Sequence, residues 1–107
     1  MSRKAWFIGS DMLIGAINTK DAKTNEFDNE ATVTFTLYDS ETVRPVAGAS
    51  DLPAEYEPDS NGEYYGNLPA AVTATLERGH KYYMLMTITG INYNLVLYED
   101  RKADYYP

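Results

Sequence analysis

The sequence predicts an all-β protein, folded as a single antiparallel β-sandwich of about seven short strands. Hydrophobic and polar residues alternate over much of the chain, which is the period of a strand with one buried face. Turn-forming residues separate these runs about every ten positions. The pattern also lacks the 3.6-residue period of an amphipathic helix.

The chain is 107 residues long, which fits one domain over residues 1–107. A chain of this length buries well over half of the surface that its unfolded form exposes, so we expect it to fold without stabilising disulfides or metal ions. It has no cysteine, which excludes disulfides and thiolate metal sites. Residues 99–107 are polar and predict an extended tail after the last strand.

The net charge is −7, and it is concentrated in residues 21–63, which contain eleven acidic and two basic residues. This balance argues against binding to nucleic acid, because neutralising phosphates requires a cationic face. It suits a solvated surface or a basic protein partner. The apolar run at residues 12–17 is far shorter than a membrane-spanning helix. Asp11 interrupts the weak signal-peptide pattern, so we expect no membrane partner and synthesis in the cytoplasm.

The first part of the chain predicts two or three strands and one long loop. Residues 4–8 and 11–17 are expected to form two short strands, or one strand that is broken at Gly9-Ser10. Residues 18–30 are expected to form a polar loop that Phe27 pins to the core. Residues 31–38 alternate cleanly, with one apolar face and one face lined by threonine. The inward set is Val33, Phe35 and Leu37, and the outward set is Thr32, Thr34 and Thr36.

The middle of the chain predicts an edge strand and a hairpin turn. Residues 43–46 are expected to form a short strand that Pro45 confines to an edge, because proline has no N–H to donate. The loop that follows contains only a brief strand at residues 54–57. Asn61-Gly62 lies between two strand-like runs, and both residue types tolerate positive φ, which predicts a β-hairpin turn.

Four strands are expected after this turn, over residues 63–68, 72–76, 82–89 and 92–98. The inward residues of the first three are Tyr64, Gly66 and Leu68, then Val72, Ala74 and Leu76, then Tyr82, Met84, Met86 and Ile88. Leu85 points outward, where another element or a partner would cover it. In the fourth strand the inward residues are either Leu95 and Leu97 or Val96 and Tyr98.

The spacing Leu76-x-x-Gly79-x-x-Tyr82 is that of a tyrosine corner. In this motif the tyrosine hydroxyl bonds to a backbone group a few residues upstream and locks a connection between two sheets. The expected fold is therefore an Ig-like or transthyretin-like sandwich. Its predicted structural residues are Asn61, Gly62, Gly79 and Tyr82.

The chain contains little that points to catalysis. His80 is the only histidine, and we expect an exposed turn residue, since no neighbouring motif supports a nucleophile–base pair. Residues 59–63 resemble a calcium loop but lack its alternating oxygen ligands and its bidentate glutamate. We therefore predict no catalytic residues, no metal and no cofactor.

Aromatic residues are the best candidates for an interface. The chain has ten tyrosines, and an apolar ring with a polar tip suits both half-buried strands and interfaces. The predicted interface residues lie at the chain ends and on outer strand faces: Trp6, Phe7, Tyr65, Tyr83, Leu85, Tyr105 and Tyr106. The alternative for the chain ends is that they extend edge strands and cover the ends of the core.

Several short motifs also follow one another in a recognisable order. They are WFIGSDMLI at 6–14, TNEFDNEATV at 24–33, LYD at 37–39, PVAGA at 45–49, GEYYGNLP at 62–69 and GHKY at 79–82. In this order, over about residues 6–90, the chain resembles small Ig-like proteins that tailed bacteriophages and prophages encode among their head and head–tail genes. It departs from them in its charged, tyrosine-ended tail.

The resemblance implies a virion structural protein, made in the host cytoplasm, that binds capsid or neck proteins and its own copies. Its role would be that of an accessory (decoration) or head–tail connector subunit, and the resemblance supplies no catalytic residues. The alternative is an Ig-like carbohydrate- or surface-binding module, in which Tyr56, Tyr65, Tyr83 and Tyr93 stack on sugar rings. A third hypothesis, a small hydrolase, requires His80 within hydrogen-bond reach of a serine or an acid in a cleft.

Overall fold

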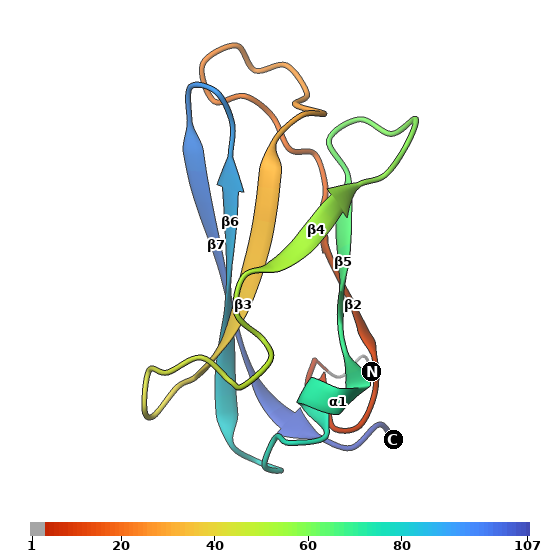
Figure 1. Ribbon diagram of the computed structural model, residues 1–107, viewed down its shortest axis with the longest axis vertical. Helices are drawn as coiled ribbons and strands as arrows, with labels where there is room; N and C mark the ends of the chain where they lie inside the picture. The colour runs from red at the N-terminus through yellow and green to blue at the C-terminus, as the bar shows by residue number, and fades with distance from the viewer. Residues whose placement is uncertain (1–3) are drawn as a thin grey trace.

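The computed structural model describes residues 4–107, which form an all-β protein with a mixed, seven-stranded sheet (Figure 1). The strands are β1 (Trp6–Phe7), β2 (Met12–Ala16), β3 (Thr32–Asp39), β4 (Leu52–Tyr56), β5 (Tyr64–Leu68), β6 (Lys81–Thr89) and β7 (Asn94–Asp104), and the helix is α1 (Ala70–Thr73). The sheet order is β1-β7-β6-β3-β4-β5-β2, and the sheet curls until it is nearly closed into a barrel. The predicted all-β class is confirmed.

Two three-stranded halves make up this sheet. β3, β6 and β7 form one half, and β4, β5 and β2 form the other, with antiparallel pairing inside each half. A short ladder, centred on the pairing of Thr34 with Pro53, joins β3 to β4. β1 adds to β7 in parallel, where Trp6 pairs with Ala103. Among residues 4–107, β2 and β7 do not pair with each other, so the barrel stays open between them.

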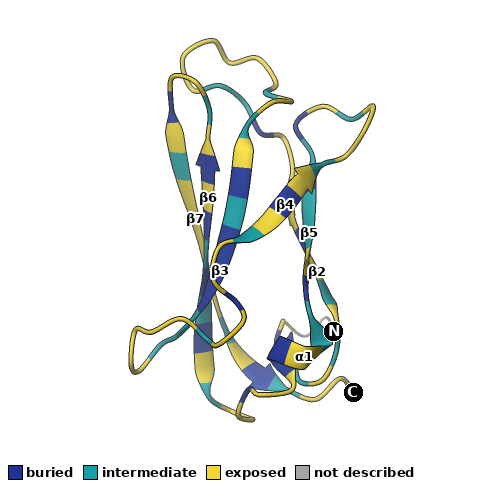
Figure 2. Ribbon diagram, in the orientation of Figure 1, coloured by how far each residue is buried: buried dark blue, intermediate teal, exposed yellow. Residues whose placement is uncertain are grey.

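The core lies between the two halves, and the alternation of β3 and β6 builds much of it. The residues predicted to face inward on these strands are all buried, namely Val33, Phe35, Leu37, Tyr82, Met84, Met86 and Ile88. Figure 2 shows them as dark blue bands on β3 and β6. Tyr64 and Leu68 of β5 close the core from the other half, and Gly66 between them is half-buried.

The predicted strand at residues 72–76 is wrong, because this segment contains helix α1 and turns. Pro69 precedes the helix with a φ of −68°, a value that is already set for a helix start. The buried residues follow helical spacing and are Val72, Thr73 and Leu76. Ala74, expected to face inward, is exposed. A threonine holds an inward position because its hydroxyl donates to the Ser10 carbonyl at 2.7 Å, which the alternating pattern could not reveal.

The predicted tail at residues 99–107 is wrong over most of its length, because β7 continues to Asp104. Residues 99–102 pair with residues 81–84 of β6, and β1 covers the other edge of β7 at Ala103. The polar composition concealed the strand. Arg101 occupies an inward position, where its guanidinium lies 4.6 Å from the ring centroid of Trp6, and this cation–π contact compensates for a charge at the core.

The structure selects one of the two inward sets predicted for the start of β7, Leu95 and Leu97, which lie opposite the buried Ile88 and Met86. Leu95 is half-buried, whereas Val96, Leu97 and Tyr98 are all exposed. The register places Leu95 and Leu97 on the same face as the buried residues of β6. That face is exposed at Leu97 and Glu99, where the barrel is open, and it is covered again at Arg101 and Ala103.

The predicted edge strand at residues 43–46 is also wrong. Val43 has a φ of 57°, which is a left-handed conformation that ends an extended run. Pro45 makes only an isolated bridge to Tyr38. The brief strand expected at residues 54–57 is present as β4, which begins earlier, at Leu52.

Two side chains differ in burial from what the sequence predicts. Phe27 does not pin its loop to the core; its ring is exposed, and the ammonium of Lys20 lies 5.0 Å from the ring centroid. Thr36, expected on the outer face, is buried. Its hydroxyl accepts a hydrogen bond from the N–H of Asp51 at 2.9 Å, so the loop before β4 covers it.

The Asn61-Gly62 turn lies in a hairpin between β4 and β5, as predicted, although the loop is longer than two residues. Gly62 has a φ of 68°, and a Cβ atom on it would lie 2.5 Å from the carbonyl oxygen of Thr19. Its N–H donates to Oδ1 of Asn29 at 2.8 Å. Glycine is therefore required here both for backbone conformation and for the close approach of the long loop.

Candidate functional site

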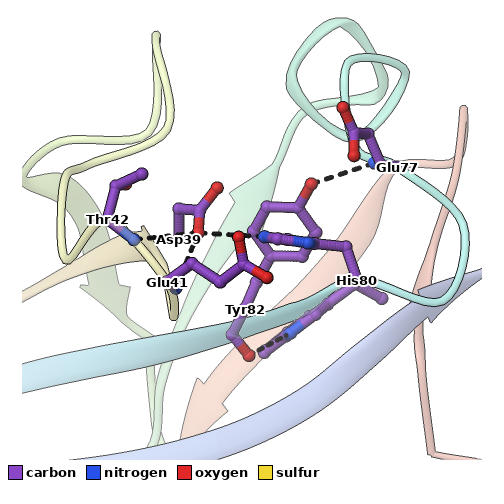
Figure 3. Close-up of polar contacts among 7 residues, drawn as sticks. Asp39, Glu41, Thr42, Glu77, His80 and Tyr82 are labelled. Carbon is purple, nitrogen blue, oxygen red and sulfur yellow. Dashed lines mark hydrogen bonds and ion pairs between the residues drawn. The ribbon is translucent and has the colours of Figure 1, made fainter.

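The corner between α1 and β6 contains the predicted tyrosine corner and the single histidine (Figure 3). The hydroxyl of Tyr82 accepts a hydrogen bond from the N–H of Glu77 at 2.9 Å, which is the backbone contact that the sequence spacing predicts. Gly79 makes the turn with a φ of 82°, a conformation that glycine adopts without strain. The carbonyl of Tyr82 accepts a second bond, from the indole N–H of Trp6 at 3.0 Å. One tyrosine thus fixes both the corner and β1.

His80 is not the exposed turn residue that we expected, because its side chain is largely buried and paired. Its Nε2 atom lies 2.9 Å from Oδ1 of Asp39. The same carboxylate oxygen accepts hydrogen bonds from the N–H groups of Glu41 and Thr42 (Figure 3). The bond between the two side chains lowers the pKa of Asp39 and raises the pKa of His80. Both shifts favour the charged pair.

The acid that the hydrolase hypothesis requires beside His80 is present as Asp39, and both residues line one pocket. A hydrolase would also need a nucleophile on the other ring nitrogen of His80. The pocket beside this residue has a volume of about 390 Å³, and Thr75 is one of its lining residues. The Thr75 hydroxyl instead donates to the carbonyl of Val72 at 2.7 Å. Within residues 4–107, Asp39 is the only hydrogen-bond partner of the imidazole. This geometry suits a clamp that joins the turn after β3 to the corner.

The acidic segments do not converge on a metal site. Within the described residues, no group of three or more histidine, cysteine or carboxylate side chains is placed to hold a metal ion. Residues 59–63 belong to the β4–β5 hairpin loop, where Asp59 adopts a φ of 65°. In the part of the chain that the structure describes, no helix is long and apolar enough to cross a membrane.

The second candidate site is the open seam, which we define as the groove between β2 and β7. It has a volume of about 150 Å³, and the buried residues Trp6, Ile14 and Met84 form part of its lining. Leu13 borders it on β2 and Leu97 on β7, with exposed fractions of 74% and 47%. A groove between two strand edges that is lined in part by apolar side chains is a suitable surface for an extended segment of another chain.

The seam is ionic near β1 and apolar farther along β7. Arg101 forms an ion pair with Glu99 and donates a long hydrogen bond to the carbonyl of Ala5 at 3.4 Å. Burial lowers the pKa of Arg101, but an arginine keeps its charge in proteins. Val96 and Tyr98, beyond this cluster, are each 62% exposed. Figure 2 shows this part of β7 mostly in yellow.

Three tyrosines form a stacked row on the outer face of β3, β6 and β7. The ring centroids of Tyr38 and Tyr83 are 5.0 Å apart, and those of Tyr83 and Tyr98 are 5.3 Å apart. Stacked rings cover each other's faces and present their edges to solvent. A sugar that stacks on an aromatic ring needs a free face, so this row is a poor sugar platform.

The other tyrosines offered as sugar contacts are separate from this row. Tyr93 is buried, and its hydroxyl donates to Oδ2 of Asp28 at 2.6 Å. Tyr65 lies over Gly15 of the neighbouring strand, and Tyr56 packs against another tyrosine of the β4–β5 hairpin. These rings do not form one exposed surface.

The predicted interface residues do not form one common surface, although two of them, Phe7 and Tyr106, are in contact. Trp6 is buried in the core, and Phe7 packs edge-on against Tyr106 with ring centroids 5.0 Å apart. The guanidinium of Arg78 lies 5.6 Å from the ring centroid of Tyr105. Tyr65 lies in one half of the sheet, and the half-buried Tyr83 and Leu85 lie in the other. The aromatic chain ends therefore contact each other and the protein, but Tyr105 and Tyr106 stay largely exposed.

No protein-family model, curated protein or solved structure matches the chain. The seam must therefore be interpreted from its own geometry. Sequence reasoning did not select Leu13, Val96, Leu97 or Tyr98 as interface residues, although a signal was present. Residues 95–98 are four consecutive apolar residues, which a strand cannot all turn toward one core.

Proposed function

We propose that this protein is a structural subunit of a tailed-phage virion, either an accessory (decoration) subunit or a head–tail connector or neck subunit. The observation that carries the assembly part is the open seam, where exposed leucines on β2 and β7 flank a groove lined by apolar side chains together with Glu99 and Arg101. The phage part is supported by the order of motifs in residues 6–90, which resembles small Ig-like head and head–tail proteins. Its partners would be capsid or neck proteins and further copies of itself.

Assembly through the seam would use the backbone as well as side chains. An edge strand presents N–H and C=O groups that a strand of a partner can pair with, and the side chains beside it set specificity. Repeated copies on one particle would convert a modest affinity into stable attachment. This mechanism needs no catalytic group, so we propose that the protein is not an enzyme.

We also propose that the open barrel is an Ig-like sandwich whose two sheets are joined along one side. In an Ig domain, strands C, F and G form one sheet, strands B, E and D belong to the other, and a tyrosine corner lies between strands E and F. Here β3, β6 and β7 correspond in chain order to C, F and G, and β2, β5 and β4 to B, E and D. The Tyr82 corner lies between β5 and β6. The pairing of β3 with β4 is a departure, since it joins the two sheets.

The carbohydrate-binding alternative has less support. It requires a group of tyrosines with free ring faces on one surface. The three tyrosines that do gather, Tyr38, Tyr83 and Tyr98, stack on one another instead. Only the ring at the end of the row, Tyr98, is strongly exposed.

Mass spectrometry of purified virions tests the proposal. Particles of the phage that encodes this chain should contain it in a fixed ratio to the major capsid protein. A deletion strain complemented with Leu13→Asp should give particles that lack the subunit, because a carboxylate would sit at the β2 side of the seam. Val43→Asp, an exposed valine outside the seam, should be incorporated normally. Absence from wild-type particles, or equal incorporation of both variants, would refute the proposal.

A further inference from the structure

We infer that the outer edge of β7 binds a second copy of this chain, as an antiparallel strand pair with its two-fold axis at Leu97. This inference rests on the proposed function in one respect, since it says how the proposed assembly subunit would bind another copy of itself. It is tested in solution, without virions. Three properties of the edge point to this partner: its free backbone groups, its side chains and its charges.

The even-numbered residues of β7 direct their backbone N–H and C=O groups away from β6. Hydrogen-bonded and non-bonded pairs alternate in an antiparallel ladder. The N–H of Gly90 bonds to the Tyr93 carbonyl and the N–H of Ala103 to the His80 carbonyl, both at 2.9 Å. These two bonds show that the odd-numbered residues of β7 direct their backbone N–H and C=O groups toward β6. β1 pairs with β7 only from Ala103 onward. Among residues 4–107, no strand therefore pairs with the outward backbone groups of Asn94, Val96, Tyr98 and Asp100.

Residues 94–98 of this edge carry none of the usual protection against strand pairing, and the charged residues of β7, which include the inward-facing Arg101, begin only at Glu99. Proteins block exposed edges with proline, lysine, inward-pointing charges or a bulge. Residues 94–98 contain no proline and no charged residue. The register with β6 runs without a bulge from the pair of Thr89 with Asn94 to the pair of Lys81 with Lys102. The result is an exposed apolar edge, which is a surface that proteins otherwise avoid.

The side chains of this edge complement themselves when two copies meet antiparallel at Leu97. In that register Leu97 faces its own counterpart, Val96 faces Tyr98 of the second copy, and Asn94 faces Asp100. The pair of valine with tyrosine joins a β-branched and an aromatic side chain, which stabilises a sheet. Symmetry makes this pair occur twice. Even-numbered residues then oppose even-numbered residues, so the free backbone groups of both copies meet.

Charge favours a second copy over a strongly charged partner. Residues 64–107 contain four basic and four acidic residues, so β6 and β7 belong to an electrically balanced part of an acidic chain. The proposed register sets no like charges opposite each other, since Glu99 faces Leu95 and Asp100 faces Asn94. β1 occupies the edge at Ala103, which limits the shared ladder to about residues 94–100.

A single cysteine at the axis tests the register. The chain has no cysteine, so any disulfide of the Leu97→Cys variant must join two copies. Position 97 would be a non-hydrogen-bonded pair with Cα atoms about 4.5 Å apart, a separation that a disulfide spans. Leu13→Cys, an even more exposed leucine on β2, is the matched control. Mild oxidation should give a covalent dimer with Leu97→Cys and little with Leu13→Cys, and the opposite result would overturn the assignment to β7.

Sedimentation equilibrium measures the same pairing without a cross-link. The wild-type protein should show a monomer–dimer equilibrium, and Val96→Lys should raise its Kd roughly tenfold or more, because lysine enters both valine–tyrosine pairs. Val43→Lys is the control, since Val43 and Val96 have the same exposed fraction, 62%. Circular dichroism would verify that both variants fold. A wild-type protein that stays monomeric up to its solubility limit, or equal effects of both variants, would refute this inference and leave the virion proposal to the particle experiment.

Discussion

Replacing Tyr82 with phenylalanine tests the tyrosine corner, because it removes one hydroxyl and leaves the buried ring in place. The bond that is lost comes from the N–H of Glu77 at 2.9 Å. An intramolecular hydrogen bond contributes about 1 kcal/mol, and a buried donor left without a partner costs about 1–3 kcal/mol. Glu77 is exposed, so water can replace part of the lost bond. We therefore expect the free energy of unfolding to fall by about 1 kcal/mol.

Substitutions of two other tyrosines provide a comparison for this loss of stability. The hydroxyl of Tyr64 donates to the Asp28 carbonyl at 2.6 Å and accepts from the N–H of Ala31 at 3.0 Å. Tyr64→Phe loses two bonds and should cost roughly twice as much as the change at the corner. Tyr98 is exposed, and its hydroxyl has no hydrogen-bond partner among residues 4–107. Its replacement by phenylalanine should change stability by less than about 0.5 kcal/mol.

Urea unfolding followed by tryptophan fluorescence measures these differences. Trp6 is the only tryptophan, it is buried, and its indole bonds to the carbonyl of Tyr82. Its emission should therefore report the loss of the core and the corner together. The three variants should share the wild-type m-value, so that shifts of the midpoint reflect stability alone. If Tyr82→Phe is as stable as the wild type while Tyr64→Phe is weakened, the corner contributes nothing and the reasoning is refuted.

Three further predictions concern stability. The raised pKa of His80 and the lowered pKa of Asp39 make their pairing fully stabilising between the ordinary values of 3.8 for the carboxyl and 6.5 for the imidazole. The free energy of unfolding should decline as the pH rises through the pKa of His80, and it should also decline as the pH falls through the pKa of Asp39. In urea titrations, His80→Gln should flatten the decline on the alkaline side. An unchanged dependence of stability on pH in this variant would contradict the prediction. Gly62→Ala should lower the free energy of unfolding by about 2 kcal/mol more than Gly79→Ala does. A Cβ atom at position 62 would lie 2.5 Å from a backbone oxygen, whereas one at position 79 has nothing within 4 Å. Equal melting temperatures of the two variants would contradict this prediction. Deleting residues 99–107 should unfold the protein, since it removes part of the β6–β7 ladder and the partner of β1. A native circular dichroism spectrum of the truncated chain would instead support the prediction that these residues are a tail after the last strand.

Alternation predicted the inner faces of β3 and β6 because each strand has one apolar and one mostly polar face. A shift of one residue would expose the whole set that contains Phe35 or Met86, so the pattern allows a single register. The same reasoning could not decide which face of β7 points inward. Leu95 and Val96 lie on opposite faces and are both apolar, while Arg101 is charged and inward. Which face is covered there depends on β1 and β2, which come from the other end of the chain.

Two contacts at the corner also differ in how far the sequence predicts them. The contact of Tyr82 with Glu77 is local, so a short spacing was enough to predict it. His80 and Asp39 are 41 positions apart, and no motif connects them. The pairing of β3 with β6 brings them together, because it sets Asp39 opposite Tyr82, two residues after His80.

The symmetry of strand pairing decides whether self-association stops at two copies. A pair of β7 strands uses the same edge twice and is closed, whereas pairing of β7 with β2 of the next copy would leave free edges at both ends and continue into a filament. The edge of β7 is free over about residues 94–100 and β2 has 5 residues, so the pair of β7 strands can form the longer ladder. Gly15 also places a residue without a side chain in the middle of β2, beneath the ring of Tyr65. We therefore expect a finite dimer whose β2 edges remain free for a partner on the particle. Sedimentation velocity that shows a series of ever larger species, abolished by Leu13→Asp, would instead identify pairing between β7 and β2.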